Sequence, residues 1–234
     1  RFNKNRNKIY KNKMTSLFKD IIKETLRRGK SLPRILINNR MRKTSKIGGK
    51  ILDLAAGINK PSYYRFLQVD KNAKIISVDI SEAKKPHIKA DLEKPFPFKD
   101  REFDNIFCFN LLEHIFNYRN VINESFRVLK NNGRIIGTVP FLGSVHGDPD
   151  DYFRYTKSTL NRLFQGAGFK EINIEPLGYG PFCINYYMIA FLFPKLIRIP
   201  LIFIAIFLDK IIAKLNKKHN KEKYVLMYYF ECRK

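Results

Sequence analysis

Short apolar runs alternate with amphipathic segments through the middle of the chain, and most of the runs end in small or acidic residues. The runs predict six β-strands. They lie at 51–54, 74–78, 88–90, 104–109, 134–139 and 170–174. A further strand is predicted over 224–232, and helices are predicted over 118–130 and after Thr156, which can cap the second helix. Alternating strands and helices predict an α/β fold with a seven-stranded, mostly parallel sheet and helices on both faces.

Two segments depart from this alternation. Residues 15–28 form an amphipathic helical pattern behind a polar, basic stretch, and residues 181–208 hold two dense apolar runs interrupted by prolines and basic side chains. Neither run has the roughly 20 apolar residues that a spanning helix needs. Residues 181–208 therefore suit a lid over a ligand pocket, a contact with one face of a membrane, or ordinary core.

These patterns predict four segments. We expect a basic helical N-terminal arm over 1–49, a core over 50–180, a hydrophobic helical insertion over 181–222, and a closing strand over 223–234. The pattern also marks Pro33 and the Gly48-Gly49 pair as breaks before the first strong strand.

Charge is concentrated at the two ends of the chain. The net charge is +24, of which residues 1–50 contribute +15, residues 51–208 contribute +4 and residues 209–234 contribute +5. Basic ends suit nucleic acid, an anionic membrane surface or an acidic substrate, although solvated surface explains them equally well.

Three widely spaced cysteines, Cys108, Cys183 and Cys232, form no disulfide framework and no zinc motif, so we expect a reducing compartment and no metal. Residues 1–13 show no secretory signal. We therefore expect a cytoplasmic protein, which can also lie peripherally on the cytoplasmic face of a membrane.

Acidic and small residues close the first two strands. Asp53 precedes the small residues Ala55 to Gly57, which let the backbone turn and approach a ligand closely. Asp79 ends the second strand 22 residues after Gly57, where a carboxylate can accept both hydroxyls of a ribose. The glycine fingerprint for a pyrophosphate is absent, because only Gly57 of that pattern is present.

Further motifs follow in order: DLEKPFPF at 91–98, FD at 103–104, NLLEH at 110–114 and LKNNG at 129–133. Together with the strand ends, they resemble the class I S-adenosylmethionine-dependent methyltransferases, and more narrowly their small-molecule branch, over residues 50–175. The resemblance implies a Rossmann-like fold and S-adenosylmethionine as the cofactor.

The resemblance also implies roles for residues near the first two strand ends. Asp53 and the turn from Ala55 to Gly57 would hold the methionine part of the cofactor, and Asp79 would bind the ribose hydroxyls. Ala55 stands where the family usually has Gly, a modest change if its φ is negative, and Asn59 stands where it often has another Gly.

Two more strand ends complete the implied cofactor site. Asp91 and the backbone of Leu92 would face the adenine amino group. Asn110 and Leu111 would lie under the cofactor, where the fourth strand ends.

The segment 141–156 is rich in candidate catalytic groups and resembles a stretch in methyltransferases associated with surface polysaccharides and glycolipids. His146 is the first choice as general base, because imidazole titrates near neutral pH. Asp151 can orient it, and Arg154 can hold an anionic or polar acceptor. The alternatives are turn chemistry and a structural Arg154–Asp151 pair. His114, beside Glu113, is a weaker candidate.

We therefore predict S-adenosylmethionine-dependent methyl transfer, by O-methylation of a glycan, glycolipid or isoprenoid-type acceptor. An anionic membrane surface is the expected partner of residues 181–208 and the basic ends. The alternative is an RNA-binding or RNA-methylating protein, or a catalytically idle binding module, on the same fold. The strand-four end lacks the Asn/Asp-Pro-Pro-aromatic motif of enzymes that methylate nucleic-acid amines, because Asn110 is followed by two leucines.

Overall fold

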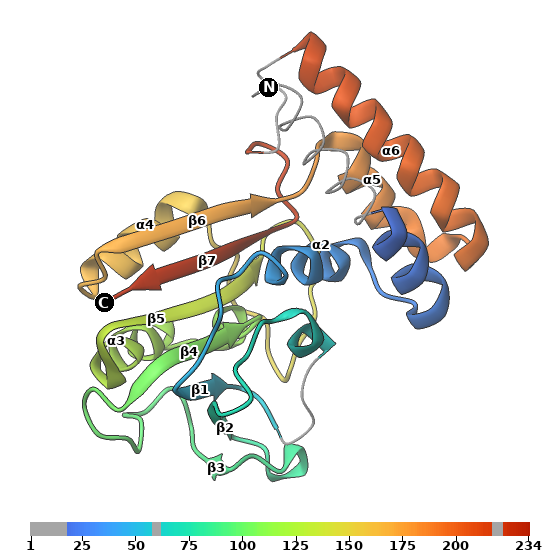
Figure 1. Ribbon diagram of the computed structural model, residues 1–234. Helices are drawn as coiled ribbons and strands as arrows, with labels where there is room; N and C mark the ends of the chain where they lie inside the picture. The colour runs from blue at the N-terminus through green and yellow to red at the C-terminus, as the bar shows by residue number, and fades with distance from the viewer. Residues whose placement is uncertain (1–17, 58–61, 217–221) are drawn as a thin grey trace, which may run out of the picture. The chain divides into compact units, whose positions relative to one another are not determined.

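The computed structural model describes residues 18–57, 62–216 and 222–234 (Figure 1). The chain divides into two compact units. The sheet unit consists of residues 44–177 and 225–234, and the helical unit consists of residues 1–43 and 178–224. The N-terminal segment and the insertion before the last strand, which are far apart in the sequence, thus belong to one unit.

The sheet unit holds one seven-stranded sheet. Its strands are β1 (Lys50–Leu54), β2 (Lys74–Asp79), β3 (Ile88–Lys89), β4 (Phe103–Phe109), β5 (Leu129–Pro140), β6 (Glu171–Leu177) and β7 (Met227–Arg233). The strand order is β3-β2-β1-β4-β5-β7-β6, and only β7 runs antiparallel to its neighbours. The Rossmann-like, mostly parallel sheet predicted from the sequence is therefore confirmed.

Helices and short 3-10 turns cover the two faces of this sheet. They are η1 (Ser62–Phe66), η2 (Glu82–Lys84), η3 (Leu112–His114), α3 (Tyr118–Val128) and α4 (Lys157–Gly166). Ile106 and Cys108 of β4 share a core with residues of α3 and α4. Phe107 and Phe109, which alternate with them along the strand, instead contact Tyr64 and Tyr63 of η1.

Local signals in the sequence set some of these boundaries and miss others. The predicted cap is confirmed, because the Thr159 amide donates to Thr156 Oγ1 at 3.2 Å at the start of α4. Leu129, assigned from the sequence to the end of a helix, begins β5 instead, because it pairs with Phe103 in the sheet. Pro33, marked as a break, lies in the first turn of a helix, a position that proline tolerates.

The helical unit contains a helical segment over residues 18–28, α2 (Leu32–Met41), α5 (Pro181–Ile189), η4 (Ala190–Leu192) and α6 (Lys195–Leu215). Helices α5 and α6 pack side by side (Figure 1). The buried carboxylate of Asp209 on α6 accepts the Phe182 and Cys183 amides, each at 2.9 Å, and so caps α5. Helix α6 continues through Pro200, which the sequence marks as an interruption.

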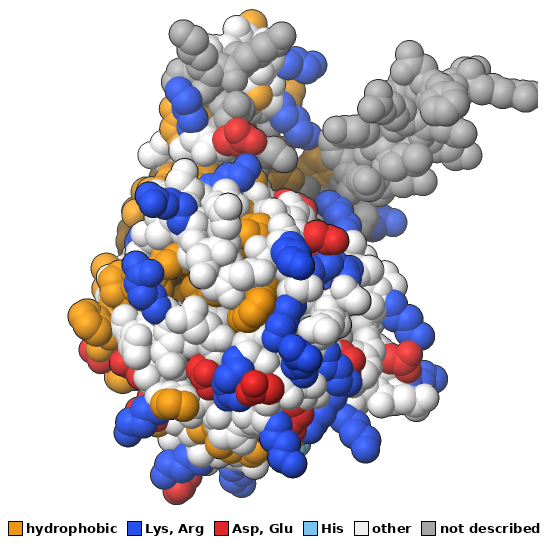
Figure 2. Space-filling view, turned by 90° about the vertical axis from the view of Figure 1, so that its left-hand side faces the viewer, with side chains coloured by type: hydrophobic (Ala, Val, Ile, Leu, Met, Phe, Trp, Pro, Cys, Tyr) orange, Lys and Arg blue, Asp and Glu red, His pale blue; other side chains and the backbone are white. Residues whose placement is uncertain are grey.

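Within the described part of the chain, every helix is too short or too polar to cross a bilayer. Charged side chains lie over much of the face drawn in Figure 2, with Lys and Arg mixed among fewer Asp and Glu. Charged side chains of the sheet unit also form ion pairs with one another, such as Lys130 Nζ with Asp104 Oδ2 at 2.9 Å. Residues 1–17, the beginning of the predicted basic N-terminal arm, lie outside the described residues.

Candidate active site

Strand ends bring the predicted cofactor residues to one edge of the sheet. In a parallel sheet the carboxyl ends of neighbouring strands share an edge, and β2, β1 and β4 are neighbours in that order. Asp53 and Ala55 lie at the end of β1, Asp79 ends β2, and Asn110 directly follows β4.

Asp53 is a buried acid with one oxygen engaged. Its Oδ2 accepts a short hydrogen bond from the Tyr64 hydroxyl, while its buried Oδ1 has no hydrogen-bond partner. Burial raises the pKa of Asp53 to about 7, although the Tyr64 hydroxyl acts in the opposite direction. A buried carboxylate oxygen without a donor suits a ligand that brings a positive or hydrogen-bonding group.

The turn after β1 contains a residue with strained backbone geometry. Ala55 has a φ of +58°, so the condition under which an alanine would be a modest change here, a negative φ, is not met. This left-handed conformation costs an alanine about 1–2 kcal/mol, which a glycine would not pay. Gly57 lies so close to the backbone of η2 that an added Cβ would meet the Lys84 carbonyl oxygen at 2.0 Å.

Asp79 is buried and connects the cofactor edge to the segment predicted to hold the acceptor. Its Oδ1 accepts from the Ser81 amide at 2.8 Å, and its Oδ2 lies 3.1 Å from Lys84 Nζ. The same ammonium group lies 3.3 Å from Asp148 Oδ2. Lys84 therefore joins the end of β2 to the loop that follows β5.

The remaining predicted cofactor residues are held by contacts within the chain. Asp91 Oδ1 accepts from the Glu93 amide at 2.9 Å, and the carbonyl of the buried Leu92 accepts from Asn120 Nδ2 at 2.9 Å. Asn110 has a φ of +51°, and its Oδ1 accepts from the Thr138 hydroxyl at 2.6 Å. Leu111, which follows it, is buried.

The predicted catalytic residues lie together in the loop after β5. Arg154 grips Asp151 with two guanidinium nitrogens, and this pairing holds the pKa of the Asp151 carboxyl well below its usual range. Asp151 Oδ2 also accepts the His146 amide at 2.9 Å and lies 3.6 Å from His146 Nδ1. The Asp151–Arg154 pair, weighed from the sequence as a structural alternative, is present.

Glu113 and His114 lie against this loop from the end of β4. The Glu113 side chain is fully buried, and neither of its carboxylate oxygens has a hydrogen-bond partner. Burial raises the pKa of Glu113 to about 8. His114 Nε2 lies 3.7 Å from Glu113 Oε1, and the His114 and His146 rings meet edge to face at 5.2 Å.

Sequence reasoning overlooked two residues of this edge and gave a third a minor role. Tyr64 and Lys84 carry no motif, because their contacts with Asp53 and Asp79 depend on how the segments after β1 and β2 fold back. Glu113 received only a minor role beside His114, because a sequence does not reveal that a carboxylate is buried without a partner.

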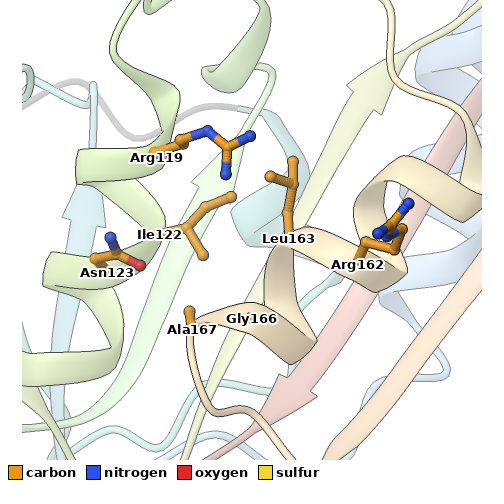
Figure 3. A pocket seen from close by; sticks show the side chains of 7 residues that line it. All are labelled: Arg119, Ile122, Asn123, Arg162, Leu163, Gly166 and Ala167. Carbon is orange, nitrogen blue, oxygen red and sulfur yellow. The ribbon is translucent and has the colours of Figure 1, made fainter.

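Two further features bear on the site. Cys108 is fully buried in the middle of β4, and burial raises the pKa of its thiol well above the usual value, which suits core rather than a nucleophile. A pocket of about 170 Å³ lies between α3 and α4, lined by Arg119 and Arg162 among others, and none of the predicted site residues contributes to it (Figure 3).

Parts of this sequence are similar to known proteins. Residues 48–137 match the family described as "Methyltransferase domain". An uncharacterized protein of Methanocaldococcus jannaschii is 37% identical over 78 residues, which cover 32% of this chain and 34% of that protein, so the chain matches about a third of that relative's length. Demethylmenaquinone methyltransferase of Lactococcus lactis is 24% identical over 183 residues, covering 59% of this chain and 73% of that protein.

A solved structure shows the same fold. The crystal structure of a SAM dependent methyltransferase from Archaeoglobus fulgidus superimposes with a TM-score of 0.57 at 18% identity, covering 91% of this chain and 97% of that one. The strand order, the strand-end acids and the family match define an α/β enzyme domain of the class I methyltransferase type. Residues 48–137 form a methyltransferase domain on a class I fold, and S-adenosylmethionine is the cofactor that this domain indicates, as predicted from the sequence.

Proposed function

We propose that the chain methylates a hydroxyl group of a glycan, glycolipid or isoprenoid-type acceptor. The observation that carries this proposal is the cluster of His146, Asp151, Arg154 and Glu113 at the edge of the sheet that holds Asp79. Bound S-adenosylmethionine supplies an electrophilic methyl group. A hydroxyl acceptor additionally requires a group that takes its proton, whereas a neutral amine does not.

The cofactor edge has the polar groups that S-adenosylmethionine requires. The unpartnered Oδ1 of Asp53 suits the ammonium group of the methionine part, and the buried Asp79 carboxylate suits the ribose hydroxyls. We propose that Ala55 and Gly57 lie against the methionine part, that Asp91 and Leu92 face the adenine, and that Asn110 and Leu111 lie beneath the cofactor.

His146 is the group best placed to take the hydroxyl proton. Its Nδ1 lies 3.3 Å from the Ser144 carbonyl oxygen, which can only accept, so Nδ1 carries the hydrogen and Nε2 has a free lone pair. Asp151 cannot serve as the base, because Arg154 stabilises its charged form. We therefore assign Asp151 to positioning His146, and Arg154 to holding Asp151 and a polar acceptor.

We further propose that the helical unit contacts an anionic lipid surface. Apolar side chains form an exposed stripe along α6 at helical spacing, including Leu196, Phe207 and Leu215 at 74%, 62% and 81% exposure. Basic side chains flank the stripe at Lys195, Arg198, Lys210 and Lys214. Apolar surface beside basic side chains suits the headgroup region of anionic lipid, where an acceptor with a lipid tail is also found.

Labelled cofactor tests the acceptor class. The enzyme is incubated with trideuteromethyl S-adenosylmethionine and separate glycan, lipid and RNA fractions, and mass spectrometry locates the label. We expect label in the glycan or lipid fraction, and none with Asp79→Ala. Label confined to RNA would favour the nucleic-acid alternative, and no label in any fraction, with cofactor binding intact, would favour an idle binding module.

The His146 assignment has its own test. We expect His146→Ala to lower the transfer rate by about 10²–10⁴-fold while cofactor affinity, measured by calorimetry, stays unchanged. The matched variant His87→Gln, far along the chain in the same unit, should retain the parent rate. A His146→Ala enzyme with the parent rate would remove His146 from the chemistry.

Liposome flotation tests the lipid contact. The intact protein should float with anionic vesicles at low salt, and Phe207→Asp should reduce the bound fraction by roughly 10-fold, because it puts a charge into the apolar stripe. Lys195→Glu should reduce it less. Vesicles that leave the intact protein in solution, or a self-association of the chain that Phe207→Asp abolishes, would contradict the lipid proposal and favour a protein interface.

A further inference from the structure

We propose that Glu113, His114 and His146 form a binding site for a first-row divalent metal ion of the Zn²⁺ or Co²⁺ kind. One ligand atom of each side chain lies within 4.8 Å of the other two. The three residues come from two loops, after β4 and after β5, so the sheet brings them together. One carboxylate and two imidazoles are a donor set that suits these ions.

The first independent observation is the state of Glu113. Its side chain is fully buried, and both carboxylate oxygens lack a hydrogen-bond partner. A buried carboxylate is costly unless it is paired, hydrogen-bonded or coordinated to a metal. Its neighbour Asp151 shows the alternative, since two Arg154 nitrogens and the His146 amide satisfy it completely.

The second observation is the orientation of the two imidazoles. His114 Nδ1 lies 2.6 Å from the Asp150 carbonyl oxygen, and His146 Nδ1 lies 3.3 Å from that of Ser144. A carbonyl only accepts, so each Nδ1 carries the hydrogen and each Nε2 keeps its lone pair. A hydrogen bond from the second ring nitrogen to a backbone carbonyl is the arrangement that supports metal-binding histidines.

The distances between the ligand atoms are close to those that a tetrahedral metal ion requires. Ligands about 2.1 Å from a tetrahedral ion lie roughly 3.4 Å apart, and His114 Nε2 lies 3.7 Å from Glu113 Oε1. His146 is half exposed on a loop that contains Gly143 and Gly147, so a small movement of its ring brings it to bonding distance and leaves an entry path.

The surrounding charges tolerate a cation. Arg154, which acts electrostatically on Glu113, is paired with Asp151, and this pairing offsets its positive charge locally. Lys84, the nearest lysine that the contacts join to this loop, is bound to Asp79 and Asp148. The three ligands leave coordination positions open to water or another oxygen ligand. While the ion is bound, the Nε2 lone pair of His146 is engaged, so metal binding and the proton acceptance proposed above are alternative states of His146.

Direct metal binding tests the site without relying on activity. Untagged protein is treated with a chelator and desalted, then titrated with Co²⁺ while the visible spectrum is recorded, and with Zn²⁺ by calorimetry. We expect one ion per chain and a visible band from histidine-bound Co²⁺. We expect His114→Ala, His146→Ala and Glu113→Gln each to weaken binding by at least about 10-fold, the loss that even outer-shell substitutions cause.

His87→Gln is the matched control, because His87 binds Ser77 through Nδ1 and lies outside the cluster. Its affinity for Co²⁺ should equal that of the parent. Should Glu113→Gln fail to fold, the loop variant His146→Ala decides the question. Binding that is absent in the parent, or equal in the parent and in His146→Ala, overturns the proposal.

Cofactor affinity and transfer rate in the same samples separate this proposal from the proposed function. Methyl transfer that depends on His146 but survives chelation, with no Co²⁺ bound, leaves His146 as a base and removes the metal site. One ion bound through the three residues, with cofactor bound but no transfer to any acceptor fraction, keeps the site and removes the proposed function.

Discussion

The carboxyl edge of the sheet buries charged side chains, whereas the hairpin of α5 and α6 exposes apolar ones. At the sheet edge, carboxylates are buried, and Asp53 and Glu113 keep oxygens that nothing in the described chain satisfies. On the hairpin, large apolar side chains such as Leu196 and Phe207 face solvent. Both departures cost free energy in the isolated chain, and each would be relieved by a different kind of ligand.

Asp209 in the helical unit extends this comparison, because it is a buried acid whose two carboxylate oxygens both have hydrogen-bond donors. Both of its oxygens accept backbone amides at the start of α5. Burial of an acid is therefore not in itself a sign of a binding site in this protein. Burial without a donor marks Asp53 and Glu113 at the edge of the sheet, and it also occurs at Glu24 Oε2 in the helical unit, so the sign of a site is an unpartnered acid at the strand ends.

The largest expected effect concerns Asp53. Its pKa is raised by burial from 3.8 to about 7, so the folded state holds the proton over a pH range in which the unfolded state has lost it. Stability contributed by this group is therefore present at low pH and lost as pH rises towards 7. Between about pH 5 and pH 8 the loss should reach about 3 kcal/mol.

Urea unfolding of the cofactor-free protein at the two pH values measures this loss. Asp53→Asn should reduce the difference by about 3 kcal/mol, because an amide does not ionise, whereas the part due to Glu113, whose pKa burial raises to about 8, should remain. Asp70→Asn should not, since Asp70 is a surface acid whose pKa is lowered by Lys46. If the free energy of unfolding changed equally with pH in the parent and in Asp53→Asn, Asp53 would have an ordinary pKa, and water would reach this edge of the sheet.

Asp79→Ala should lower S-adenosylmethionine affinity by roughly 100-fold. Charge-assisted hydrogen bonds contribute about 1.5–3 kcal/mol each, and two to a ribose would exceed this loss. Calorimetry on the folded variant, with Asp70→Ala as a control, measures it. A near-parent affinity would remove Asp79 from the cofactor site and leave it as the partner of Lys84 alone.

Asp209→Ala should produce the smallest of these effects, within the helical unit. Two buried amides would lose their acceptor, and hydrogen exchange at Phe182 and Cys183 should accelerate by about 10-fold or more, which corresponds to about 1.4 kcal/mol. Lys214→Ala, an exposed change on the same helix, should leave these amides protected. Equal exchange in both variants would mean that α5 does not depend on this cap.

Much of the fold and part of the site were predictable, because the relevant signals are local. Apolar runs with polar ends located the strands, and Thr156 marked the start of α4. Asp53, Asp79 and Asn110 were found because residues that end parallel strands share an edge of the sheet. The family resemblance supplied their expected roles, and the match over residues 48–137 confirmed the class and the cofactor.

Other features depended on tertiary structure. Ala55 adopts a positive φ because the chain must turn over the end of β1, a requirement that its own side chain does not reveal. The N-terminal segment and the α5–α6 insertion come from opposite ends of the sequence, and no local pattern links them in one unit.

The sequence by itself determined the sheet, the class of enzyme and the acids at its strand ends, since these follow from spacing within short segments. The tertiary structure alone decided which acids have partners. Glu113 and His146 are separated by 33 positions and meet because β4 and β5 pair in register, and Asp151 is satisfied because Arg154 lies within its reach. Burial and pairing depend on distances across the fold, and those distances are set by the packing of the whole sheet.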